Sequence, residues 1–205
     1  MYLFSVVVLS ASEYRLNDIV KNYPGARDYA CTNPSSLACQ YLTQTSASND
    51  YVQLARLVHA KIVEEPWLGL DPSVIAIHVR AGDGIIGPDC FTNRSQCLHT
   101  SCCVYGRDRA YFDELDLPNG TYVLYSNTKH GNRREGMQRK YLTDVMQYLS
   151  QFGPIIHKVN TPIDEAFTEM ATACSLYITG GGFGKLARKV HRVLSVSESH
   201  RNKCA

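Results

Sequence analysis

The chain has 205 residues, of which 44% are hydrophobic and 20% are charged. This is the composition of a globular chain with one or two small domains, and it excludes an intrinsically disordered protein. The 21 Lys and Arg residues nearly balance the 19 Asp and Glu residues, leaving a net charge of +2. We therefore expect no nucleic acid among its partners, because nucleic-acid-binding proteins carry a marked basic excess.

An apolar stretch from Tyr2 to Leu9 opens the sequence. It is much shorter than the roughly 20 residues that a helix needs to span a bilayer, so we expect no transmembrane segment. The stretch also lacks the basic flank of a signal peptide. We interpret it as a buried strand, with a residual targeting segment as the alternative.

The first 70 residues contain two helical patterns separated by a polar segment. Apolar residues recur at near-helical spacing over Glu13–Asn22 and again over Tyr51–Glu65, where Pro66 follows the pattern's end. The segment between them, Ala26–Asn49, is rich in Ser, Thr, Asn and Cys and has no clear period, so it is predicted to be a loop. We interpret residues 1–70 as a reduced N-terminal subdomain.

Strands and helices alternate through most of the remaining chain. Four apolar runs predict strands, at Val74–Val79, Thr121–Ser126, Pro154–Val159 and Leu176–Thr179. Three amphipathic patterns predict helices, at Glu135–Phe152, Pro162–Cys174 and Phe183–Leu194. Such alternation predicts an α/β fold, in which residues 71–205 form a Rossmann-like parallel sheet with right-handed crossovers.

The chain has eight cysteines, and Cys90, Cys97, Cys102 and Cys103 lie close together. Disulfides, free thiols and a metal site are the three interpretations, although the spacing lacks the paired CxxC pattern of zinc sites. Oxidation of this cluster would indicate the Golgi or another secretory lumen, and free thiols the cytoplasm. The segment from Asp83 to Tyr111 is too long for an ordinary connection, so we expect it to cover a bound donor or acceptor.

A run of glycines follows the last predicted strand, in Thr179-Gly180-Gly181-Gly182-Phe183-Gly184-Lys185. Glycines at a turn from strand to helix let backbone amides approach a phosphate, and the helix N-terminus favours its charge. The run is not a Walker P-loop, because Leu186 stands where Ser or Thr would bind magnesium. The alternative is a tight turn that serves only helix packing.

A histidine lies near the end of the first predicted strand, and an arginine follows that strand directly. Alternation places His78 and Arg80 on one face and Ile77 and Val79 on the other. An arginine leaving a buried strand needs an anionic partner, and its planar donors suit a phosphate. The alternatives are an internal ion pair for Arg80, with Asp83 or Asp164, and a hydrogen-bonded core position for His78.

These two segments resemble a known family. His78-Val-Arg80-x-Gly-Asp83 after an apolar strand is similar to the HVRRGD-type motif of fucosyltransferase-like glycosyltransferases with GT-B architecture. The later segment, from an acidic residue and a helix to Ala173-x-x-x-Tyr177 and the glycine run, resembles that family's closing motif. The resemblance covers about Ser73–Leu194, the donor-binding half of such enzymes.

The resemblance implies a transfer of a sugar, fucose from GDP-fucose, to a glycan or glycoprotein acceptor. Arg80 would bind the donor diphosphate and stabilise the leaving nucleotide, and His78 would contact the base or ribose. Asp164, or the neighbouring Glu165, would lie near the base or ribose as well. The residues expected to hold a phosphate are Thr179, Gly181, Gly182 and Phe183.

Three departures separate this chain from the family pattern. Ala81 stands where many members have a second arginine, Gly180–Gly182 replaces a Ser-rich turn, and the segment before Ser73 is shorter than a full acceptor-binding domain. The alternative functions are transfer from another donor, such as UDP-xylose, and a catalytically silent sugar-binding or protein-binding module.

The expected reaction is an inverting displacement without a metal or other cofactor. The sequence has no DxD-like carboxylate pair placed to hold a divalent ion on a diphosphate, so Arg80 and helix-terminal amides would stabilise the leaving group. The predicted general base is Asp83, because it follows Arg80 by only three positions and can therefore lie within about 10 Å of the phosphate site. The alternative is that Asp83 only balances the charge of Arg80 or caps a turn.

Overall fold

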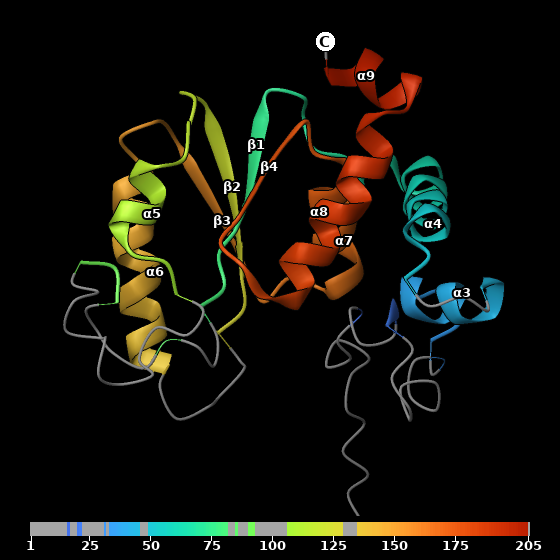
Figure 1. Ribbon diagram of the computed structural model, residues 1–205, viewed down its shortest axis with the longest axis horizontal. Coiled ribbons are helices and arrows are strands. Elements are labelled where there is room, and N and C mark those ends of the chain that lie inside the picture. The colour runs from blue at the N-terminus through green and yellow to red at the C-terminus, as the bar shows by residue number, and fades with distance from the viewer. Residues whose placement is uncertain are drawn as a thin grey trace, which may run out of the picture.

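The computed structural model describes residues 16, 20–21, 31, 33–45, 49–81, 85, 90–92, 106–128 and 135–204. Its centre is a parallel four-stranded sheet in the order β3-β2-β1-β4 (Figure 1). The strands are β1 (Val74–His78), β2 (Thr121–Ser126), β3 (Ile155–Val159) and β4 (Ser175–Ile178). The predicted α/β fold with a Rossmann-like parallel sheet is therefore confirmed.

Helices cover both faces of this sheet (Figure 1). On one face, α4 (Tyr51–Glu64), α7 (Ile163–Thr172) and α8 (Gly181–Ser195) pack with Ala76 and Val123. On the other face, α6 (Glu135–Leu149) and the short α5 (Arg109–Asp113) pack with Ile77 and Leu124. Because side chains alternate along a strand, neighbouring strand residues enter opposite cores.

The strand order creates a switch point beside β1. The chain builds β1, β2 and β3 outward in one direction and then returns to place β4 on the free side of β1. In open parallel sheets, ligands bind outside the carboxyl ends of the strands where the order reverses. The adjacent carboxyl ends of β1 and β4 are that place here.

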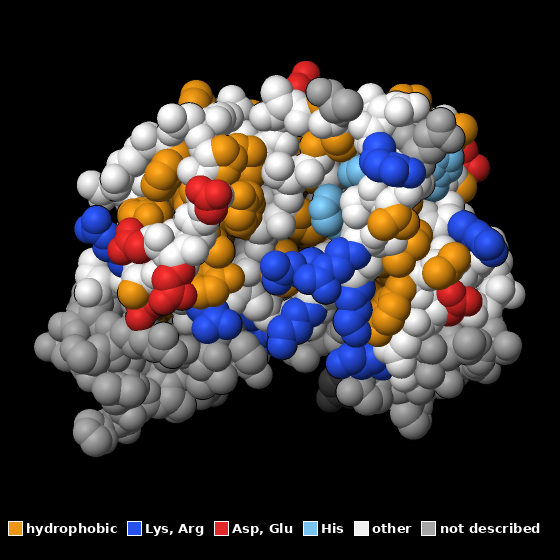
Figure 2. Space-filling view, turned by 45° about the horizontal axis from the view of Figure 1, so that its top comes forward, with side chains coloured by type: hydrophobic (Ala, Val, Ile, Leu, Met, Phe, Trp, Pro, Cys, Tyr) orange, Lys and Arg blue, Asp and Glu red, His pale blue; other side chains and the backbone are white. Residues whose placement is uncertain are grey.

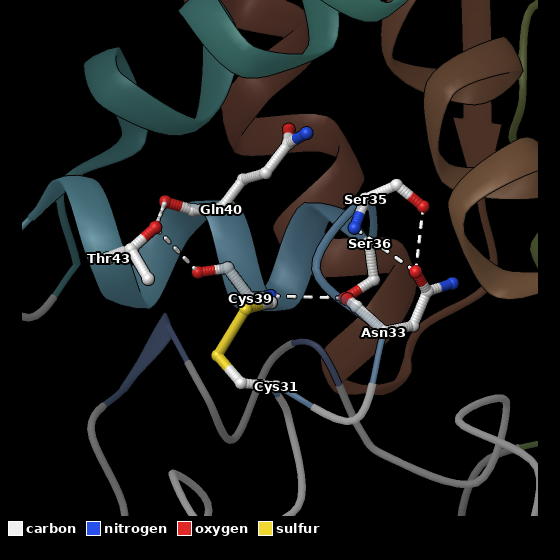
Figure 3. The surroundings of a disulfide bond; sticks show 7 residues. All are labelled: Cys31, Asn33, Ser35, Ser36, Cys39, Gln40 and Thr43. Carbon is white, nitrogen blue, oxygen red and sulfur yellow. Dashed lines mark hydrogen bonds between the residues drawn. A yellow bond between two sulfur atoms is a disulfide. The ribbon is translucent and has the colours of Figure 1, made fainter.

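One predicted loop is wrong, because Ala26–Asn49 contains the helix α3 (Leu37–Gln44). The polar residues around this helix suggested a loop, but one of them, Ser36, caps the helix. The Oγ of Ser36 accepts a hydrogen bond from the backbone N–H of Cys39 at 3.2 Å, and Cys39 forms a disulfide with Cys31 (Figure 3). Leu37 is fully buried, so a single turn of apolar contacts and a cap are enough to order this helix.

The helices and strands predicted from Tyr51 onward are present, some with shifted ends. The helix predicted at Glu135–Phe152 ends at Leu149, and the helix predicted from Phe183 begins at Gly181. Met1–Leu9 and most of Glu13–Asn22 lie outside the described residues, although Leu16 and Val20 are helical and buried with α7 and α8.

The C-terminal end adds α9 (Glu198–Cys204), and η2 (Pro66–Leu68) is a 3-10 turn before β1. A disulfide joins Cys204 of α9 to Cys174, the residue before β4. Cys90 is also disulfide-bonded, which favours the disulfide interpretation over free thiols for that residue. Among the helices that the structure describes, none has the length and apolar character needed to cross a membrane.

Candidate functional site

The two segments singled out in the sequence lie side by side at the switch point. His78 of β1 pairs with Ile178 of β4, and the backbone N–H of Thr179 donates to the carbonyl of His78 at 3.0 Å. The backbone N–H of Arg80 then donates to the Oγ1 of Thr179 at 3.0 Å. Thr179 is 1% exposed, so its hydroxyl is a buried link between the two strand ends.

The glycine turn fits closely around Arg80. Gly181 has φ +78°, a conformation that L-residues rarely adopt, and a Cβ there would lie 2.7 Å from the Cδ of Arg80. The Arg80 side chain therefore lies against the turn because residue 181 has no side chain. Gly182 follows in the first turn of α8, where backbone N–H groups lack intrahelical partners.

Gly184 allows α8 to approach β1. A Cβ at this position would lie 2.7 Å from the Nδ1 of His78. Gly184 therefore supports the alternative that the glycine run serves helix packing, because its missing side chain makes room for His78 of β1. By contrast, no atom lies within 4 Å of the Cβ position of Gly180, so that glycine is required by its φ of +141° and not by packing.

His78 is held as a neutral imidazole. Burial and the nearby charge of Arg80 lower the pKa of its ring to about 4. Its Nδ1 is buried and finds no hydrogen-bond partner among the described residues, and its ring lies 5.8 Å from that of Phe183, between centroids. At neutral pH this side chain can donate or accept a hydrogen bond, but it carries no positive charge that would attract a phosphate.

A second arginine reaches the same turn, and the sequence analysis missed it. The Nε of Arg107 donates to the carbonyl of Thr179 at 2.9 Å, and its guanidinium lies 4.7 Å from the centroid of the Tyr111 ring. The hydroxyl of Tyr111 donates to the carbonyl of Ile178 at 2.8 Å. Arg107 precedes Asp108, which caps α5, and this cap is a local signal that a helix begins there.

The surface near this end of the sheet carries many positive charges. Figure 2 shows Lys and Arg side chains gathered in the middle of one face, close to histidine. The exposed basic residues of α8 are Lys185, Arg188, Lys189 and Arg192. Although the net charge of the chain is only +2, this distribution favours an anionic ligand.

The predicted acidic residues have different outcomes. The carboxylate of Asp164 accepts a hydrogen bond from the backbone N–H of Leu37 at 2.9 Å and so joins α7 to α3. Burial raises the pKa of the Asp164 carboxyl, and the bond from Leu37 opposes that shift. Asp83 lies outside the described residues.

A buried polar cluster joins α7 to β2 and β3. Glu169 is 4% exposed, and its carboxylate accepts hydrogen bonds from the hydroxyl of Tyr125, at 2.7 Å, and from the Nζ of Lys158. Burial and the bond to Glu169 raise the pKa of the Tyr125 hydroxyl. Because these groups satisfy one another, the cluster stabilises the packing of α7 on the sheet.

The described residues include no group of three His, Cys, Asp or Glu side chains placed to hold a metal ion. The chain has no significant match among protein-family models, curated proteins or solved structures. The interpretation of the site therefore depends on its own geometry and on the resemblance of its two motifs.

Proposed function

We propose that the protein is a glycosyltransferase that moves fucose from GDP-fucose to a glycan or glycoprotein acceptor. The main support for this proposal is the contact between the two motifs at the switch point, where Arg80 lies against Gly181. In this proposal residues 71–205 are the donor-binding half of a GT-B-type enzyme, and residues 1–70 belong to the acceptor side.

The chemistry of the site supports a diphosphate ligand. Arg80 leaves β1 beside a turn whose glycines keep side chains away from the backbone. The N-terminus of α8, which begins at Gly181, adds backbone N–H donors and a partial positive charge. These groups would stabilise the negative charge that develops on the leaving nucleotide diphosphate, the role that a metal ion has in other transferases.

The remaining roles follow from the side chains around this contact. His78, neutral and partly exposed, would hydrogen-bond the base or ribose, and Phe183 would line the phosphate side. Thr179, whose buried hydroxyl accepts from the backbone N–H of Arg80, would hold the turn in place. Asp83 is the proposed general base for the acceptor hydroxyl, in an inverting single displacement. For Asp164 the role near the base or ribose depends on the resemblance alone, because its described hydrogen bond goes to α3.

Nucleotide-dependent stabilisation tests this proposal. We expect GDP to raise the unfolding temperature of the wild-type chain, because a ligand present at 100 times its Kd adds about 2.7 kcal/mol of stability. Arg80→Ala should lose most of this stabilisation, whereas Arg56→Ala, an exposed change on α4, should retain it. The unliganded unfolding temperatures of both variants report whether the fold itself has changed.

Donor identity and metal dependence are then decided by a transfer assay. GDP-fucose and UDP-xylose are compared as donors, each with and without EDTA. Transfer of fucose that persists in EDTA supports the proposal, and transfer from UDP-xylose alone supports the related enzyme with another donor. A chain that neither GDP nor UDP stabilises is not a nucleotide-sugar transferase, and the silent binding module then becomes the better interpretation.

A further inference from the structure

We propose that Arg107 is a second diphosphate-binding residue of this site, acting together with Arg80. This inference rests on the proposed function and assigns a group that neither motif contains. Arg107 lies 27 positions after Arg80, just before α5 (Arg109–Asp113). The sheet topology nevertheless brings it to the carboxyl end of β4.

The orientation of Arg107 is set by contacts that leave most of its donors available. Its Nε donates to the carbonyl of Thr179 at 2.9 Å, and its guanidinium stacks over Tyr111 with 4.7 Å to the ring centroid. Its backbone N–H and carbonyl both bond the hydroxyl of Tyr141, each at 2.9 Å. A guanidinium has five N–H donors, so one bond through Nε leaves the two terminal nitrogens for a ligand.

The charge of Arg107 has no acidic partner in the described part of the chain. Its side chain contacts the carbonyl of Thr179 and the ring of Tyr111, and its backbone bonds the hydroxyl of Tyr141. A partly buried guanidinium without a counter-ion is costly, and a bound phosphate would offset that cost through paired charge-assisted hydrogen bonds. Arginine suits this role because its planar donors match phosphate oxygens.

Arg80 and Arg107 approach the same turn from different segments. Arg80 lies against the position of residue 181, and Arg107 bonds the carbonyl of residue 179. Two residues of chain extend at most about 7 Å, so both guanidinium groups lie beside one short stretch of backbone. A diphosphate carries two charged groups, and two cations at one turn could each take one of them.

The Tyr111 contact prepares Arg107 for binding. The hydroxyl of Tyr111 donates to the carbonyl of Ile178, the last residue of β4. Tyr111 and Arg107 therefore bond the carbonyls of two successive residues, Ile178 and Thr179. A cation held in place before the ligand arrives loses less conformational entropy on binding. The alternative is that Arg107 only tethers its segment to β4, in which case its loss would affect stability but not nucleotide affinity.

The test compares affinities for GDP, UDP, GMP and inorganic pyrophosphate by titration calorimetry. We expect Arg107→Gln to weaken GDP binding by about 10- to 100-fold, the range for a lost charge-assisted hydrogen bond, and to weaken GMP binding less. Arg107→Lys keeps a positive charge and should lose less affinity than Arg107→Gln. The control is Arg109→Gln, because Arg109 is 63% exposed and pairs with Asp113; its GDP affinity should stay within about twofold of wild type.

The outcomes separate this inference from the proposed function. If the wild-type chain binds GDP and both Arg107 variants bind it equally well, the role of Arg107 is overturned and the proposed function stands. If wild type binds pyrophosphate in an Arg107-dependent way but binds neither GDP nor UDP, the anion site stands and the proposed function fails. If wild type binds none of these anions, both are overturned.

Discussion

At the level of single residues, His78 shows how a strand end changes side-chain chemistry. Its pKa is lowered to about 4 by burial and by Arg80, so the ring is neutral in the folded protein at pH 7 and binds a proton more readily after unfolding. The unfolded chain, with an ordinary histidine pKa near 6.5, therefore takes up protons first as the pH falls. Stability contributed by His78 is present above about pH 6.5 and is lost as the pH falls toward 4.

This loss can be measured by denaturant unfolding at pH 7 and pH 5. We expect the contribution of His78 to fall by about 2 kcal/mol between these values. His78→Gln cannot titrate, so its stability should fall less over the same interval. The other histidines with lowered pKa, His157, His191 and His200, are shared by both proteins and cancel in the comparison. Equal losses in the two proteins would mean that His78 is not buried as a neutral ring.

The general base is the second prediction at this level. Asp83→Asn should leave GDP binding nearly unchanged and lower turnover by about 10²- to 10⁴-fold, because a lost general base affects proton transfer and not the donor phosphates. Asp116→Asn, an exposed change, is the control. Wild-type turnover in Asp83→Asn would remove Asp83 as the base. The next residue to test would then be Asp89, the other acidic residue predicted to follow the first strand closely.

At the level of elements, the start of α8 depends on residue 181 having no side chain. Gly181→Ala should destabilise the protein by about 1–2 kcal/mol, since the backbone at φ +78° is unfavourable for an L-residue. The added Cβ would also collide with Arg80, so GDP should stabilise this variant less than wild type.

Gly136→Ala provides the matched control for that change. Gly136 lies in α6, and no atom is within 4 Å of its Cβ position. Alanine is favoured over glycine in a helix by up to about 1 kcal/mol, so this variant should be at least as stable as wild type. Chemical unfolding of the two alanine variants measures both effects. A Gly181→Ala variant with the unfolding free energy of wild type would contradict the described turn.

The short helices illustrate the limits of periodicity as a predictor. α3 spans eight residues and α5 spans five, too few for a repeated apolar pattern to stand out. Each is capped by a side chain, Ser36 for α3 and Asp108 for α5. The caps are visible in the sequence, but Ser and Asp are equally common in loops, and only burial of Leu37 and Phe112 distinguishes these segments from turns.

At the level of the whole molecule, disulfides tie the periphery to the core. Cys31–Cys39 holds the segment before α3, and Cys174–Cys204 closes a loop of 30 residues between β4 and α9. In the chain-entropy model a loop of that length contributes about 3–4 kcal/mol. Such bonds form and persist in oxidising compartments.

Thiol titration in denaturant tests this arrangement. The described residues include five disulfide-bonded cysteines, Cys31, Cys39, Cys90, Cys174 and Cys204. Because the bond of Cys90 needs a sixth cysteine, the unreduced chain, which has eight cysteines in all, should expose no more than two titratable thiols. The same chain after reduction gives the full count and serves as the control. Eight thiols without reduction would contradict the disulfides and favour the cytoplasm.

The sequence by itself determined the sheet, its parallel strands and the two motifs that end β1 and β4. Long apolar runs and long amphipathic helices bury most of the apolar surface, so local pattern and tertiary structure agree there. Side-chain alternation along the strand also placed His78 and Arg80 on the face opposite Ile77. Ile77 does pack in the core on the α6 side of the sheet.

Only the tertiary structure decided which chain segments meet at the switch point. Strand order is a property of long-range pairing, and no local pattern encodes that β4 lies beside β1. That pairing brings Arg107, from a segment without periodicity, to the carbonyl of Thr179. It also gives Asp164 a partner in α3, the N–H of Leu37. The sequence thus specified which residues follow each strand. The contacts between those residues join positions that are distant in the chain and become neighbours only on folding.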